Sequence, residues 1–174
     1  MSNFPSLIAL IMAAAGAGAA LSPAPVGNYY GIDTVRPASG KSAPIANPSG
    51  SLVVERSADG FFYMPATING STVRFLIDTG ASMVILPRPV ADQAGIVATS
   101  HATATTVGGP QTVELASIRS FKTAGITLQD VPVAIQNSGM SIPLLGMDTL
   151  ANMGRIEIEG DRLTIRMPSQ SPGN

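Results

Sequence analysis

The chain has 174 residues, which is enough for one domain of ordinary size, and its formal net charge is −1. It has few charged residues, few aromatic residues and no basic cluster, so we expect no nucleic-acid partner. Cysteine is absent and His101 is the only histidine. This composition excludes a disulfide scaffold, a thiolate zinc site and a multi-histidine metal site. We interpret His101 as a solvated loop residue.

The N-terminal segment has the composition of a targeting element. Residues 7–21 form an uncharged apolar run that ends in alanines and glycines, as at a signal-peptide cleavage site. We expect residues 1–21 to be a signal peptide or an N-terminal membrane anchor, which the sequence leaves open. The protein is then exported and periplasmic, either soluble after cleavage or tethered to the inner membrane. Residues 22–50 are rich in Pro, Ser, Ala and Gly and predict a flexible linker.

The first half of the expected folded domain, which spans residues 51–168, reads as short strands separated by turns. We predict strands at Leu52–Arg56, Phe61–Ile68, Val73–Asp78 and Met83–Leu86, with Phe61–Ile68 returning along the first strand. Asn69-Gly70 is the dipeptide typical of a two-residue hairpin turn. A short helix is expected at Pro89–Ala94, because proline suits a first helical turn and Gly95 suits its end.

The second half continues the same pattern. It predicts a hairpin with strands at Thr103–Val107 and Thr112–Phe121, two short strands at Ile126–Leu128 and Val131–Ile135, and a short helix at Met147–Met153. A last hairpin joins Arg155–Glu159 to Arg162–Met167, with four apolar side chains expected to face the core: Ile156, Ile158, Leu163 and Ile165. Residues 169–174 are expected to be a flexible tail. Many short strands and one or two short helices predict an all-β, barrel-like domain.

Residues 75–82 form the segment of the chain that is most typical of a catalytic site. An apolar strand, Phe75-Leu76-Ile77, delivers the carboxylate of Asp78, and Thr79, Gly80, Ala81 and Ser82 follow at once. This order suits an acid held rigidly at a strand end, because a glycine allows another backbone to come close. Ser82 has two readings: it orients the Asp78 carboxylate, or it satisfies backbone groups after the loop. The other carboxylates lie at turns, helix starts or solvated strand faces and read as structural.

These residues resemble the single-domain, retropepsin-like aspartic proteases of bacteria. Three features carry the resemblance: the Asp-Thr-Gly loop, a later glycine-tipped hairpin and the Leu144-Leu145-Gly146 element before a short helix. The resemblance implies that the fold is a retropepsin-like closed β-barrel. It also implies roles by motif: Asp78 as the catalytic acid, Thr79 as the link between two loops, Gly80 as the close-approach glycine, Val107, Gly108 and Gly109 as the flap tip, and Leu144, Leu145 and Gly146 as the support of the loop.

The chain has a single Asp-Thr-Gly triplet, whereas this chemistry needs two carboxyl groups about 3 Å apart that share one proton. The second acid must come from another chain, so we expect a two-fold homodimer that hydrolyses an extended polypeptide. Water is the nucleophile in this chemistry, so we expect no metal and no organic cofactor. One alternative is a non-catalytic exported module of the same fold that binds peptides or only dimerises. Another is an exported β-domain in which the Asp-Thr-Gly loop is a coincidence.

Overall fold

The computed structural model describes residues 45–47, 50–106, 109–137 and 141–167. The predicted leader at 1–21, most of the predicted linker and the tail at 169–174 lie outside the described residues. Three residues assigned to the linker differ from the expectation, because Ile45–Asn47 forms strand β1 and pairs with Ser51–Val53. Backbone hydrogen bonding to a neighbouring strand therefore orders a piece whose composition favoured a coil. Among the described residues, none of the helices is both long and apolar enough to span a membrane.

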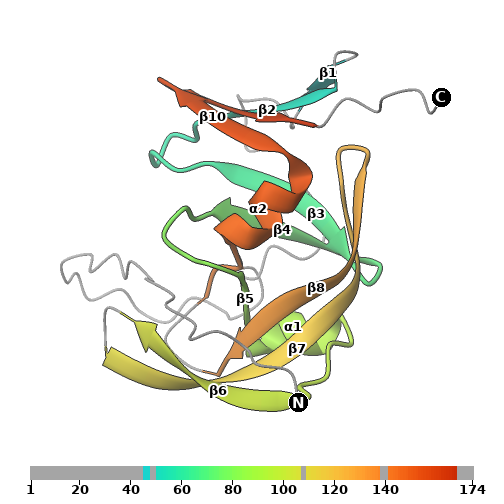
Figure 1. Ribbon diagram of the computed structural model, residues 1–174, viewed down its shortest axis with the longest axis vertical. Helices are drawn as coiled ribbons and strands as arrows, with labels where there is room; N and C mark the ends of the chain where they lie inside the picture. Colours follow the sequence, from blue (N-terminus) through green and yellow to red (C-terminus); the bar gives the residue numbers. More distant parts are fainter. Residues whose placement is uncertain (1–44, 48–49, 107–108, 138–140, 168–174) are drawn as a thin grey trace, which may run out of the picture.

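A four-stranded antiparallel sheet lies at one end of the molecule (Figure 1). Its strand order is β1-β2-β11-β10, with β2 at Ser51–Glu55, β10 at Arg155–Glu159 and β11 at Arg162–Arg166. The predicted β10–β11 hairpin is confirmed. The predicted pairing of Phe61–Ile68 with the first strand is wrong: only the isolated bridge between Arg56 and Phe62 joins them, because β11 occupies the place beside β2.

A seven-stranded sheet forms the rest of the domain and closes on itself. Its order is β3-β4-β9-β5-β8-β7-β6, and a further pairing of β3 with β7 completes the ring, with β6 outside it. The strands are β3 (Tyr63–Ile68), β4 (Ser71–Ile77), β5 (Val84–Pro87), β6 (Ser100–Thr106), β7 (Gly109–Thr123), β8 (Ile126–Gln136) and β9 (Leu144–Leu145). The predicted closed, all-β barrel is therefore confirmed.

Two local expectations need correction. The two strands predicted between residues 126 and 135 are one continuous strand, β8, because β7 pairs with it along its length. Asp130, expected in a turn, sits inside this strand with a positive φ of 52°. His101 lies on β6 rather than in a loop, although its side chain is exposed as expected.

The two short helices lie where the sequence predicts them, with α1 at Arg88–Gln93 and α2 at Met147–Met153. The hairpin at Asn69-Gly70 is also confirmed, since both residues have the positive φ values, 47° and 94°, that this turn requires.

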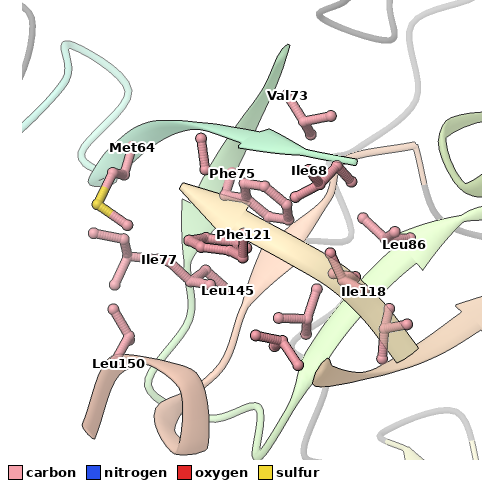
Figure 2. Close-up of a cluster of buried hydrophobic side chains, with 14 of the residues drawn as sticks. Met64, Ile68, Val73, Phe75, Ile77, Leu86, Ile118, Phe121, Leu145 and Leu150 are labelled. Atoms are coloured by element: carbon pink, nitrogen blue, oxygen red, sulfur yellow. The ribbon is translucent and has the colours of Figure 1, made fainter. Parts of the chain in front are cut away.

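The main core fills the barrel. Figure 2 shows Phe75 and Phe121 packed against each other, with ring centroids 5.6 Å apart, among aliphatic side chains from several strands and from α2. A second, smaller apolar cluster lies on the opposite face of some of the same strands. Its buried members are Ala81, Ile85, Ala104, Val113, Ala134 and Leu144. Because strand side chains alternate between faces, Val133 and Ile135 of β8 join the main core while Ala134 joins the second cluster.

The alternation predicted for the last hairpin holds for β11 and fails for one residue of β10. Leu163 and Ile165 are fully buried, whereas Ile158 is 48% exposed. β10 is the edge of its sheet, and the described part of the chain covers only about half of the Ile158 side chain. An apolar side chain is thus presented at a surface.

Candidate active site

The Asp-Thr-Gly loop begins where β4 ends, and β9 holds it from one side. Leu76 and Ile77 pair in parallel with Leu144 and Leu145, and the Asp78 amide donates to the Leu145 carbonyl at 3.1 Å. The two leucines thus extend the sheet beside the loop and fix the position of the Asp78 backbone. Hydrogen bonding across the sheet provides the rigidity that the sequence pattern suggested.

The Asp78 carboxylate is held by its own loop. The Gly80 amide donates to Asp78 Oδ1 at 2.8 Å, and the Ala81 amide donates to the Asp78 carbonyl at 3.3 Å. Asp78 is half-buried, and among the described residues it forms no ion pair. Gly80 therefore contacts the acid directly, a role that sequence reasoning missed. The signal was present, because an aspartate commonly accepts a hydrogen bond from the amide two residues later in a turn.

Gly146 packs directly against this loop. A Cβ atom built on Gly146 would lie 2.3 Å from the Met83 carbonyl oxygen and 2.8 Å from the Ala81 carbonyl oxygen. The next two amides, of Met147 and Asp148, donate to the carbonyls of Ala81 and Ser82, each at 2.8 Å. The start of α2 therefore satisfies loop carbonyls at a spacing that only glycine permits.

Ser82 does neither of the things proposed for it. Its Oγ atom is buried and has no hydrogen-bond partner among the described residues, so it contacts neither the Asp78 carboxylate nor a backbone group. Both readings of Ser82 are wrong for this single chain, because the turn of the loop buries the hydroxyl while the Gly80 amide contacts the carboxylate. Ala81 is 1% exposed and contributes its methyl group to the second apolar cluster.

The β6–β7 hairpin is the one whose tip the sequence predicts to be a flap. Val107 and Gly108 lie outside the described residues, and Gly109, with a φ of 97°, begins β7 opposite Thr106. Below the tip, Ala104 and Val113 belong to the same apolar cluster as Ala81. The hairpin is therefore packed onto the Asp-Thr-Gly loop through this cluster.

A polar network ties the base of the hairpin to the barrel. Glu114 of β7 forms an ion pair with Arg88 of α1 and accepts a hydrogen bond from Asn137 Nδ2 at 2.9 Å. The hydrogen bond from Arg88, followed by the one from Asn137, lowers the pKa of Glu114 below its usual range. The base of the hairpin is thus anchored at its outer face by charge, and its inner face is anchored by apolar packing.

Most of the other carboxylates have an ion-pair or hydrogen-bond partner. Those in ion pairs with an arginine are Glu55, Asp92, Glu114, Glu157 and Asp161. Asp59 accepts hydrogen bonds from the Phe61 amide and the Tyr63 hydroxyl, at 3.1 and 2.9 Å. Their partners agree with the structural roles expected for these acids. Within the described ranges, no three His, Asp or Glu side chains lie close enough to hold a metal ion together.

A pocket of about 300 Å³ opens beside the loop. Thr79 is exposed and lines this pocket, together with residues of the four-stranded sheet, of the segment between β2 and β3, and of the end of β4: Arg56, Gly60, Phe61, Phe62, Ile77, Ile158 and Leu163. Two of its lining side chains, Phe61 and Ile158, are each 48% exposed. The residue that directly follows the acid thus borders a pocket in which two large apolar side chains are exposed.

Comparison with known proteins agrees with this geometry. A sequence model of the family described as "gag-polyprotein putative aspartyl protease" matches residues 64–152, about half of the chain. The fold is similar to the crystal structure of a retropepsin-like aspartic protease from Rickettsia conorii. The TM-score is 0.57, the identity is 24%, and the match covers 67% of this chain and 88% of that one.

Two uncharacterized proteins are also similar. One, from Rickettsia prowazekii (strain Madrid E), is 27% identical over 119 residues, which cover 67% of this chain and 51% of that protein. The other, from Sinorhizobium sp, is 24% identical over 133 residues, which cover 73% of this chain and 57% of that protein. The chain therefore spans little more than half the length of these relatives.

Proposed function

Because the chain belongs to the gag-polyprotein aspartyl protease family, we propose that it is an aspartic-type endopeptidase that works as a two-fold homodimer. The observation that carries the proposal is the state of Asp78. Its carboxylate is half-buried, oriented by the Gly80 amide and without an ion pair among the described residues, in a loop braced by Leu145 and Gly146. A reactive acid needs this combination of fixed geometry and an unoccupied oxygen.

In the dimer, the Asp78 carboxyl groups of two chains face each other across the two-fold axis. Two carboxyls at hydrogen-bond distance share one proton, as is well established for aspartic proteases. The ionised Asp78 takes a proton from a water molecule, whose oxygen attacks the peptide carbonyl carbon. The protonated Asp78 of the other chain donates to the carbonyl oxygen. The tetrahedral intermediate collapses when the C–N bond breaks: the leaving nitrogen takes the proton that the first Asp78 accepted from water, and a hydroxyl of the intermediate returns its proton to the other Asp78. The products are an acid and an amine.

The pocket beside Thr79 supports the choice of a second copy as the partner. Phe61 and Ile158 are large apolar side chains exposed at its rim, and β10 is an open sheet edge next to it. Burying apolar surface stabilises association, and a second copy placed here brings its own Thr79 and Asp78 close to the first pair. A second copy of the chain would therefore both supply the second carboxyl group and cover the apolar side chains exposed beside Thr79.

A mixing experiment tests the shared site. Asp78→Asn should abolish cleavage of an unfolded protein while leaving the dimer intact by sedimentation. If dimers exchange freely, adding an equal amount of Asp78→Asn should lower the activity per wild-type chain to about half, because half of the wild-type chains then pair with an inactive copy. Asp148→Asn, which removes another carboxylate near the loop, is the matched control and should keep turnover. Activity that survives Asp78→Asn, or that resides in a monomer, would overturn the proposal.

The surface can be tested without touching the acid. Ile158→Glu places a charge at the rim of the pocket and should yield inactive monomers with the fold intact. Val97→Glu is the matched control, because Val97 is 78% exposed and does not line the pocket. Dimerisation or peptide binding without any turnover in the wild-type chain would instead favour a non-catalytic module.

We further propose that the protein is exported to the periplasm, soluble after cleavage or tethered to the inner membrane. The support is the uncharged apolar run at residues 7–21 and the linker-like composition that follows. An external protease should digest the chain in spheroplasts. Leu10→Arg, which places a charge in the apolar run, should leave the chain protected inside the cell. Protection of the wild-type chain in spheroplasts would refute the localisation.

A further inference from the structure

Gln136, at the end of β8, is a buried amide with an unfilled hydrogen-bonding position. The residue is 9% exposed, and its Nε2 donates to Gln111 Oε1 at 2.9 Å. Its own Oε1 is buried and has no partner in the described part of the chain. A buried acceptor without a donor is destabilising, and such atoms in folded proteins need an explanation.

The position of Gln136 on the sheet indicates what it faces. Side chains of β8 alternate, so Gln136 shares the face of Ala134, which belongs to the second apolar cluster. Pro87 of β5 is its register partner, on the face of Ile85, another member of that cluster. Gln136 therefore extends this cluster by one strand position.

The second cluster lies between the flap and the Asp-Thr-Gly loop. Ala104 and Val113 come from the flap strands, and Ala81 comes from the loop. Under the proposed function, a polypeptide that lies beneath the flap and across Asp78 lies beside this cluster. Three of its buried members are alanines, Ala81, Ala104 and Ala134, so small side chains form much of this contact between the hairpin and the loop.

Gln111 fixes the orientation of this amide. It lies on β7 two residues after Gly109 and shares the face of Val113, and its side chain is exposed. The Gln136–Gln111 pair therefore stands at the rim of the cluster, where the flap strand meets solvent. Because Nε2 is committed to Gln111, the Gln136 amide is held in one orientation with Oε1 unused.

A purely structural role explains the pair poorly. If Gln136 served only to hold two strands together, an apolar side chain of the same size would stabilise the fold better, because it leaves no buried acceptor without a hydrogen bond. The other buried orphan among the described residues, Ser82 Oγ, lies between Ala81 and Met83, which both pack in the same cluster. Both unmatched polar atoms thus belong to residues within two positions of members of this cluster.

We propose that Gln136 determines substrate specificity. The substrate side chain that enters between the flap and β8 donates a hydrogen bond to Gln136 Oε1 while its stem packs on the second cluster. This position then prefers an uncharged donor side chain, such as Gln, Asn, Ser or Thr, over an aliphatic one of similar size. This inference rests on the proposed peptidase function of the same site.

The test compares Gln136→Leu with Gln129→Leu, a matched change at an exposed glutamine of the same strand. Cleavage rates are measured for peptides that differ only in having Gln or Met at one position, and each position is varied in turn. Binding of the same peptides is measured with variants that also carry Asp78→Asn. The wild type should prefer Gln at one position by about tenfold, the value of one neutral hydrogen bond. Gln136→Leu should lose that preference, and Gln129→Leu should keep it.

Unfolding in urea separates specificity from structure. Because Gln136→Leu removes an unmet acceptor, its denaturation midpoint should equal or exceed that of the wild type. A lower midpoint, an unchanged preference, or an equal loss of activity on all peptides overturns the inference while leaving the peptidase function standing. If the wild type cleaves no peptide and Asp78→Asn binds none, the proposed function fails and this inference fails with it.

Discussion

Replacing Gly146 with alanine probes the contact between α2 and the Asp-Thr-Gly loop. The backbone of Gly146, with φ −86° and ψ 172°, is ordinary for alanine, so the substitution introduces no conformational strain. Its whole effect comes from the added methyl group. That group would lie 2.3 Å from the Met83 carbonyl oxygen and 2.7 Å from the Met83 nitrogen, both backbone atoms that cannot rotate away.

The loop must move by about 1 Å to restore an ordinary van der Waals contact. Such overpacking costs about 1–3 kcal/mol. The two hydrogen bonds from the Met147 and Asp148 amides to the loop are stretched at the same time, at about 1 kcal/mol each. We therefore expect Gly146→Ala to lower the free energy of unfolding by about 3–5 kcal/mol. A displacement of about 1 Å at a reacting group should also lower kcat about a hundredfold.

Urea denaturation and peptide cleavage measure the two effects. The matched control is Gly125→Ala, in the β7–β8 turn, where the added Cβ meets nothing within 4 Å but φ is 85°. This control carries only the conformational cost of about 1–2 kcal/mol and should leave kcat unchanged. If Gly146→Ala loses no more stability than Gly125→Ala and cleaves peptides at the wild-type rate, the close packing of α2 on the loop is refuted.

Three further changes probe the core and the charged groups. Phe75→Ala empties a fully buried position and should lower the free energy of unfolding by about 3–5 kcal/mol in urea. Glu114 has a depressed pKa, chiefly through its hydrogen bond from Arg88. Its contribution is therefore present above the ordinary pKa of a glutamate and is lost as the pH falls through the folded-state value. The difference in melting temperature between the wild type and Glu114→Gln should accordingly shrink as the pH falls from 6 to about 3. Burial, and then the hydrogen bond to Asp59, raise the pKa of Tyr63, so the wild type should lose stability above about pH 10 more steeply than Tyr63→Phe.

Each of these expectations has a contrary result. A loss below about 1 kcal/mol for Phe75→Ala would mean that the barrel interior collapses around the missing ring. Parallel melting curves for Glu114→Gln and the wild type across the acid range would show that the Arg88 pair is absent in solution. An ultraviolet titration in which removing Tyr63 deletes a phenol of ordinary pKa would contradict its raised value.

The local elements of this protein follow from local chemistry. The Asn69-Gly70 turn, the β10–β11 hairpin and the two short helices lie where the sequence predicts them, because turn residues and side-chain alternation act between near neighbours. The Asp-Thr-Gly loop after an apolar strand is likewise visible in the sequence. That the loop needs a second chain for catalysis remains a prediction, and it rests on the presence of only one Asp-Thr-Gly triplet in the sequence.

The tertiary structure decided how distant segments are arranged in the two sheets, although the family resemblance already implied that Leu144-Leu145-Gly146 supports the loop. The sequence does not say that Leu144-Leu145 enters the sheet between β4 and β5, parallel to one and antiparallel to the other. The sequence also does not predict that β10 is an edge strand with Ile158 exposed. Nor does it predict the hydrogen bond between Gln136 and Gln111. The physical reason is that an alternating pattern specifies two faces for a strand but not its neighbours. Which edge stays open, and which buried polar atom finds no partner, depends on contacts between residues far apart in the chain.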